Sequence, residues 1–160
     1  MNYSATARKS FVVTTPLYYA NDIPHIGHAY TTMAADAIAR WQRLKCRDVL
    51  LITGTDEHGQ KIERTALAAG VDPQLYCDRI AAKFDSLWSK LDIRYDRFSR
   101  TTAPNHQTIV KEFFQRVWES GDIYKGTQQG WYCVSCEEFK EERDLLADKH
   151  CPLHPSKQVE

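Results

Sequence analysis

A strand, a helix and a second strand within the first 56 residues constrain the fold more than any other feature of the sequence. The run Phe11–Thr15 is rich in β-branched residues and predicts a strand. Apolar periodicity predicts a helix from Gly27 to about Lys45. The run Val49–Ile52 is continuously apolar, which is typical of a strand covered on both faces of a parallel sheet. Since such crossovers are almost always right-handed, the sequence predicts an α/β fold built on a parallel sheet.

Two histidines, His25 and His28, lie where the first predicted strand has ended and the helix begins. Their spacing places both side chains on one side of the first helical turn. The first backbone N–H groups of a helix have no partner within it, and the helix dipole adds partial positive charge. Gly27 has no side chain, so a bulky ligand can lie against the backbone. The pattern favours a polyphosphate site, and it leaves open half of a metal site or plain polar surface.

A second polar turn, Thr53–Gly59, follows the second predicted strand. In open parallel sheets, ligands bind outside the carboxyl ends of the strands. We therefore expect Asp56 to face the same crevice as His28, where its carboxylate can hold an ammonium group. The alternative is that Asp56 caps a helix that begins near His58.

Three further helices are predicted over about 58–69, 73–91 and 105–119, with a short third strand at 97–100. Two apolar stripes are expected to face the core. The stripe of the first helix consists of Tyr30, Met33, Ala34, Ala37, Ile38, Trp41 and Leu44. The stripe of the last helix consists of Ile109, Val110, Phe113, Phe114, Val117 and Trp118.

The composition changes after Gly121, where residues 123–126 and 130–132 predict strands of a small separate element. Two pairs with a metal-ligand spacing follow, Cys133-x-x-Cys136 and Cys151-x-x-His154. Together they match a tetrahedral zinc site, and the metal would replace a core that the charged spacer lacks. His150 is a possible substitute for the fourth ligand. Because no carboxylate is placed as a general base, we expect one structural Zn²⁺; the alternative is four unrelated polar residues.

The composition excludes several classes of protein. The formal net charge of zero gives no basic excess that would indicate nucleic-acid binding. No apolar run approaches the ~18 residues that span a bilayer, so no membrane partner is expected. Residues 1–10 lack the apolar core of a signal peptide, and five cysteines are an odd number. We expect a flexible leader and a cytoplasmic protein.

The stretch Pro16–Asn21 running into His25–His28 resembles the signature of the class I aminoacyl-tRNA synthetases. Together with Thr53–Gly59 and the Cys/His knuckle, it is similar specifically to the bacterial methionyl-tRNA synthetases. The resemblance runs from Phe11 to the end of the chain. Many members carry a fourth cysteine where this chain has His154. The signature positions are Tyr19, Ala20, Asn21, Pro24, His25, Ile26, Gly27 and His28.

The resemblance implies the first half of a Rossmann-like nucleotide-binding domain over 11–121, and the start of a zinc-bearing connective insertion over 122–160. The chain is then expected to be an N-terminal piece of a longer enzyme. Such a piece lacks the second half, the Lys-Met-Ser-Lys-Ser loop and the anticodon-binding domain, so we expect it to be inactive alone in full aminoacylation.

The implied activity is that of a methionine–tRNA ligase, with methionine, ATP and tRNA(Met) as substrates and Mg²⁺ accompanying ATP. By resemblance, His25 and His28 hold the triphosphate, and Gly27 lies on the adenine side. Asp56 takes the methionine ammonium, Tyr19 lines the side-chain pocket, and backbone groups near Leu17 complete it. Two alternatives remain: another class I-like nucleotidyltransferase, and a zinc-ribbon binding module on a degenerate nucleotide fold.

Overall fold

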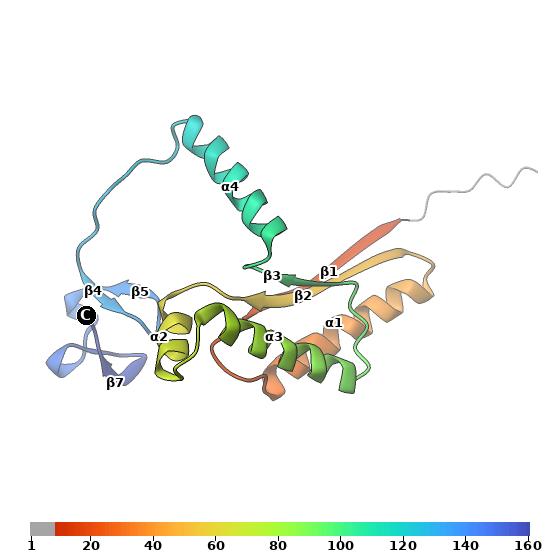
Figure 1. The fold of residues 1–160 in the computed structure, drawn as a ribbon, viewed down its shortest axis with the longest axis horizontal. Coiled ribbons are helices and arrows are strands. Elements are labelled where there is room, and N and C mark those ends of the chain that lie inside the picture. Colours follow the sequence, from red (N-terminus) through yellow and green to blue (C-terminus); the bar gives the residue numbers. More distant parts are fainter. Residues whose placement is uncertain (1–8) are drawn as a thin grey trace, which may run out of the picture. The chain divides into compact units, whose positions relative to one another are not determined.

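A computed structural model describes residues 9–160 of the chain (Figure 1). The chain divides into two compact units, Met1–Thr108 and Ile109–Glu160. The first unit contains a parallel sheet in the order β1-β2-β3, formed by Ser10–Tyr19, Asp48–Asp56 and Arg97–Arg100. Its helices α1 (Ile26–Leu44), α2 (Gln60–Ala68) and α3 (Pro73–Lys90) connect the strands. The predicted α/β class and the three parallel strands are confirmed.

The register of β1 against β2 aligns their carboxyl ends. Val13 pairs with Leu51, and after an irregularity between Thr14 and Leu17, Tyr19 pairs with Asp56. The irregularity includes Pro16, which has no N–H to give to the ladder. All three strands thus deliver their polar carboxyl-terminal residues to one edge of the sheet.

Strand β3 approaches β2 so closely at Gly54 that no other residue fits. A Cβ added there would lie 1.8 Å from the carbonyl oxygen of Ser99. Because that atom belongs to the backbone of β3, the clash could only be relieved by moving the strand. Gly54 therefore fixes the spacing of the two strands two residues before Asp56, which ends β2.

The main core lies beside the turn between β1 and α1. Tyr18 stacks on Phe84 with ring centroids 5.5 Å apart, and Trp88 is tilted against both rings. Phe84 and Trp88 are completely buried, and Ile62 of α2 joins the same cluster. The core thus supports the segment that carries the two histidines.

The expected core face of α1 is wrong. Tyr30, Trp41 and Leu44 are 76%, 56% and 77% exposed. The side of α1 that is buried carries Thr32, Ala35, Asp36 and Ala39. Small side chains let a helix lie close to a sheet, and a buried Asp36 is satisfied by the Nε of Arg40 at 2.7 Å and the N–H of Arg94 at 3.1 Å. The helix carries two rows of residues with the same helical period. The row of small residues is buried, and the row of larger apolar residues is exposed.

Helix α4 (Pro104–Glu119) crosses from the first unit into the second. None of its residues is buried, and Phe113 is 69% exposed. The expectation that its apolar stripe faces a core is therefore also wrong for the described residues. The row is apolar at helical spacing, but residues 9–160 contain no surface that covers it.

The second unit is built from two antiparallel strand pairs. They are β4 (Trp131–Cys133) with β5 (Glu138–Lys140), and β6 (His150–Cys151) with β7 (His154–Gln158). Two 3₁₀ turns, η1 (Glu142–Asp144) and η2 (Ala147–Lys149), join the pairs. The strand predicted at 130–132 is confirmed within one residue, whereas the one predicted at 123–126 is wrong because that segment is irregular.

Strand β1 begins at Ser10, and residues 1–8, which make up most of the predicted leader, lie outside the described part of the chain. Among residues 9–160, no helix is both long and apolar enough to cross a membrane.

Candidate active site and metal centre

His25 and His28 cap the helix that they begin. His25 is the N-cap of α1, with extended backbone angles, and its Nδ1 accepts a hydrogen bond from the N–H of Gly27 at 3.1 Å. In return, the Nδ1 of His28 accepts from the N–H of His25 at 3.1 Å. This is a capping box with imidazoles in place of the usual side chains. A neutral ring that accepts through Nδ1 carries its proton on Nε2.

Each ring therefore presents an Nε2–H donor away from the cap. They stack with centroids 3.8 Å apart, and His28 also packs against Tyr18 at 4.7 Å and the edge of Phe84 at 5.1 Å. Burial, and then the neighbouring His25, lower the pKa of His28. At neutral pH the ring of His28 is thus uncharged, with Nε2–H available for an acceptor on a ligand.

The structure corrects part of the anion-site expectation. The N–H of Gly27 is not available to a ligand, because it donates to His25. A Cβ at Gly27 would lie 2.9 Å from Cε1 of His25, so the missing side chain makes room for that ring. Gly27 therefore offers no backbone donor to a ligand.

Two hydrogen bonds hold the loop before His25. The N–H of Ala20 donates to the carbonyl of Asp56 at 3.0 Å, and the hydroxyl of Tyr76 donates to the carbonyl of Asn21 at 3.0 Å. Burial raises the pKa of Tyr76, so its hydroxyl keeps its proton. The signature loop is thereby tied to both β2 and α3.

Asp56 lies at the carboxyl end of β2, directly opposite Tyr19 in the register. Side chains of register partners point to the same face of a sheet, and so does that of Leu17, two residues before Tyr19. The helix-cap alternative for Asp56 is wrong, because α2 begins after Gly59, which is its N-cap. The Oδ1 of Asp56 instead accepts from the hydroxyl of Thr101 at 3.3 Å.

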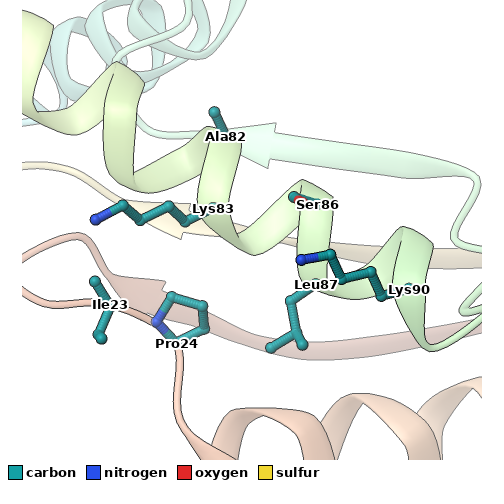
Figure 2. Close-up of a pocket in the computed structure, with 7 residues that line it drawn as sticks. All are labelled: Ile23, Pro24, Ala82, Lys83, Ser86, Leu87 and Lys90. Carbon is teal, nitrogen blue, oxygen red and sulfur yellow. The ribbon is translucent and has the colours of Figure 1, made fainter.

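A shallow groove of about 480 Å³ lies between the loop and α3 (Figure 2). Ile23 and Pro24 form one wall, and Leu87 lies between Lys83 and Lys90 on the other. Of the predicted site residues, only Pro24 lines this groove. The groove is therefore not the site that was predicted from the sequence.

Sequence reasoning missed a buried ionic cluster behind Asp56. The side chain of Glu57 is fully buried, and Arg100 binds it through Nε at 2.7 Å and Nη2 at 3.0 Å. Thr101 and Thr102 follow β3, so the rule that placed Asp56 at a strand end also applies to them. The signal was present, but threonines after a short strand carry no distinctive chemistry by themselves.

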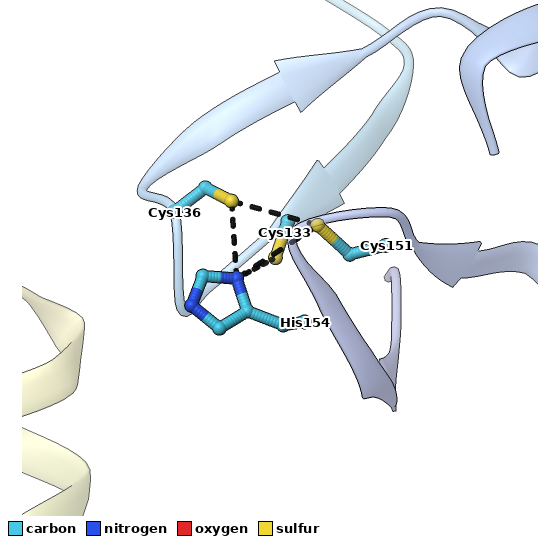
Figure 3. A group of neighbouring side chains, drawn as sticks. All are labelled: Cys133, Cys136, Cys151 and His154. Atoms are coloured by element: carbon cyan, nitrogen blue, oxygen red, sulfur yellow. Dashed lines mark hydrogen bonds between the residues drawn. The ribbon is translucent and has the colours of Figure 1, made fainter. Parts of the chain in front are cut away.

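The second unit brings the four predicted zinc ligands together (Figure 3). The ligand atoms of Cys133, Cys136, Cys151 and His154 all lie within 4.8 Å of one another. Nδ1 of His154 is 3.2, 3.8 and 4.0 Å from the sulfurs of Cys136, Cys151 and Cys133. With Zn–S bonds of ~2.3 Å, the ligand atoms of a tetrahedral site lie about 3.5–3.8 Å apart. The geometry thus fits one tetrahedral metal ion.

The cluster offers three thiols and one imidazole, a donor set that zinc prefers, and the thiols differ in their pKa values. Burial raises the pKa of Cys151, but hydrogen bonds with His154 and with the neighbouring thiols lower it to a net value of about 6. Burial and the two neighbouring thiols raise the pKa of Cys136 to about 11. His150 lies outside the cluster, with its Nδ1 at 3.1 Å from the carbonyl of Ala147. The cluster therefore contains His154 and not His150.

Comparison with known proteins identifies the class to which this architecture belongs. Residues 11–160 match the family model of the class I tRNA synthetases, type M, and the chain belongs to this family. It is 67% identical over 160 residues to a methionine–tRNA ligase of Nostoc, and 56% identical over 146 residues to a chloroplastic/mitochondrial methionine–tRNA ligase of Arabidopsis thaliana.

The chain also resembles solved structures. A Mycobacterium tuberculosis methionyl-tRNA synthetase in complex with methionyl-adenylate superimposes with a TM-score of 0.88 and 40% identity, over 95% of this chain. The chain spans 30% of the length of that structure, and likewise 30% of the Nostoc protein. The family and the fold of this segment are thus established.

Proposed function

We propose that this chain carries the first half of the catalytic site of a methionine–tRNA ligase. The observation that carries the proposal is the alignment of strand ends: Asp56 pairs with Tyr19, and the histidine pair follows the same strand. An ammonium site and two phosphate donors then border one edge of the sheet. The 67% identity to the Nostoc methionine–tRNA ligase and the likeness to a methionyl-adenylate complex support the choice of amino acid.

The proposed reaction has two steps. A carboxylate oxygen of methionine attacks the α-phosphorus of ATP, the bond to the bridging oxygen breaks, and pyrophosphate leaves with the electron pair. A ribose hydroxyl at the 3′ end of tRNA(Met) then attacks the methionyl carbonyl, and AMP leaves. Neither step needs a protein nucleophile, so the residues contribute by positioning substrates and stabilising charge.

Each residue at the strand ends has a proposed part in the first step. His25 and His28 donate through Nε2–H to the phosphate oxygens on which negative charge develops. Asp56 accepts the methionine ammonium, and Tyr19 and the backbone near Leu17 border its side chain. Gly27 lies on the adenine side of ATP. Mg²⁺ bound with ATP would neutralise part of the triphosphate charge.

The Cys/His cluster is proposed to hold one structural Zn²⁺, since four protein ligands leave no position for a substrate. The metal would stabilise the small second unit. The cytoplasm is the proposed location, because its reducing conditions keep the cysteines as thiols that can ligate the metal.

The test is amino-acid-dependent exchange of pyrophosphate into ATP by the full-length protein, with a panel of amino acids. Methionine should support exchange. Asp56→Asn keeps the shape but removes the charge, so it should weaken methionine binding tens-fold or more and affect ATP less. Exchange driven by a different acid would favour another nucleotidyltransferase. No exchange with any acid would favour a zinc-bearing binding module.

A further inference from the structure

We propose that Thr101 is a positioning residue that orients the Asp56 carboxylate toward the amino group of the substrate; this inference rests on the proposed function of Asp56. The hydroxyl of Thr101 lies between the ends of β2 and β3. It accepts the N–H of Glu57 at 2.8 Å and donates to Oδ1 of Asp56 at 3.3 Å. Thr101 itself is only 8% exposed.

The hydroxyl has one hydrogen, and its direction is determined by its surroundings. Because the N–H of Glu57 points at the oxygen, the hydroxyl must act there as an acceptor. In the described part of the chain, the hydroxyl proton of Thr101 is donated to Oδ1 of Asp56. A distance of 3.3 Å is long for this type of bond, and such bonds commonly tighten when the substrate binds.

The backbone that carries Thr101 is held from both sides. Its N–H donates to the carbonyl of Thr55 at 3.2 Å. Its neighbours Arg100 and Thr102 both bind the buried carboxylate of Glu57, which also accepts from the hydroxyl of Thr55 at 2.6 Å. Thr101 is therefore fixed before any substrate arrives.

This arrangement has a consequence for the two oxygens of Asp56. One oxygen is engaged by Thr101, which restricts rotation of the carboxylate and leaves the other oxygen for an ammonium group. Pre-organisation of this kind lowers the entropic cost of binding. A purely structural Thr101 would hold the turn through Glu57 but would not affect recognition of the amino group.

The experiment uses the full-length protein in methionine-dependent pyrophosphate exchange, with KM measured separately for methionine and ATP. Thr101→Val keeps the shape without the hydroxyl and should raise the KM for methionine about tenfold, as expected for a lost hydrogen bond to a charged group. The KM for ATP should change by less than about twofold, because the lost hydrogen bond is to Asp56, which is proposed to bind methionine and not ATP. Thr101→Ser should restore the wild-type values, and Thr101→Ala substitutes if the valine variant does not fold.

Thr102→Val is the matched control, because its hydroxyl binds Glu57 and not Asp56. It should lower the melting temperature with little change in the KM for methionine. In an Asp56→Asn background, Thr101→Val should add little, since the two residues act as a unit.

An unchanged KM for methionine in Thr101→Val, or equal defects in the valine and serine variants, would overturn the inference while leaving the proposed function intact. Normal methionine binding by Asp56→Asn would instead remove the ammonium assignment, and the role of Thr101 with it.

Discussion

His25 and His28 stabilise their own helix through Nδ1 and leave Nε2 for a ligand. One side chain thus serves two purposes, because an imidazole has an acceptor on one edge and a donor on the other. The sequence predicted that both histidines lie at a helix start and on one side. It could not predict that they occupy the backbone donors thought to bind the anion, because that depends on ring orientation and on the space beside Gly27.

A titration of His28 tests this account of the pair. Its pKa, measured by NMR, should lie below 6.5, because burial and His25 disfavour the charged ring. Replacing His25 by Asn, which also suits an N-cap, should move the pKa of His28 upward but not fully to 6.5, because the burial remains.

The same lowered pKa makes a prediction about stability. The native state binds a proton on His28 more weakly than the unfolded chain does, so the neutral ring contributes fully to the free energy of unfolding above pH 6.5. This contribution is lost as the pH falls through the lowered pKa of His28, because its protonated Nδ1 can no longer accept the N–H of His25. Amide exchange at the start of α1 should accelerate over that range in wild type. In His28→Gln, amide exchange should accelerate less over the same pH range, because Gln completes a capping box and does not titrate.

At the scale of elements, periodicity predicted where helices and strands lie much better than which faces they bury. Trp41 belongs to an apolar row that is exposed, whereas Ala39 belongs to a row of small residues that is completely buried. Both rows repeat at the helical period, so the pattern cannot rank them. Asp56 lies at the end of β2 opposite Tyr19, as the strand-end rule predicted, because β1 and β2 are parallel neighbours. The grouping of the three cysteines with His154 was predicted because the spacing of the two pairs is typical of a metal site.

Removal of the metal should unfold the segment from about Lys125 onward and leave the helices of the first unit folded. The ligands come from β4, the turn after it, β6 and β7, so metal binding and local folding are one event. Elemental analysis should find one zinc per chain. A chelator should then abolish the near-ultraviolet circular dichroism of Trp131 while amide protection in α3 persists.

Cys151→Ala should mimic the chelator, and His150→Ala is the control, because its ring contacts Ala147 instead of the cluster. A chain that contains no zinc after purification without chelator, or a second unit that stays folded in Cys151→Ala, would contradict the metal assignment.

At the scale of the whole molecule, large apolar side chains are exposed on two helices, α1 and α4. Residues 9–160 leave Tyr30 and Leu44 of α1 and Phe113 of α4 largely exposed. Large exposed apolar patches usually mark interaction sites, so we expect these rows of side chains to take part in contacts. We expect the 160-residue chain to bind a fluorescent apolar dye and to self-associate at tens of micromolar.

Replacing Leu44 by Gln should reduce dye binding and association without lowering the melting temperature, because that side chain is 77% exposed. Ala39→Gln is the contrasting variant and should destabilise the first unit, since Ala39 is completely buried. Sedimentation that shows a monomer at all these concentrations, with no dye bound, would contradict this view of the faces.

The central claim is that the histidine pair donates to phosphate where charge develops, and single-turnover formation of methionyl-adenylate by the full-length protein tests it most directly. His25→Asn retains an N-cap acceptor but removes Nε2–H, so α1 should stay folded. The rate of adenylate formation in this variant and in His28→Ala should fall by on the order of 10²–10³, with methionine affinity nearly unchanged. Wild-type rates in both variants would contradict the account.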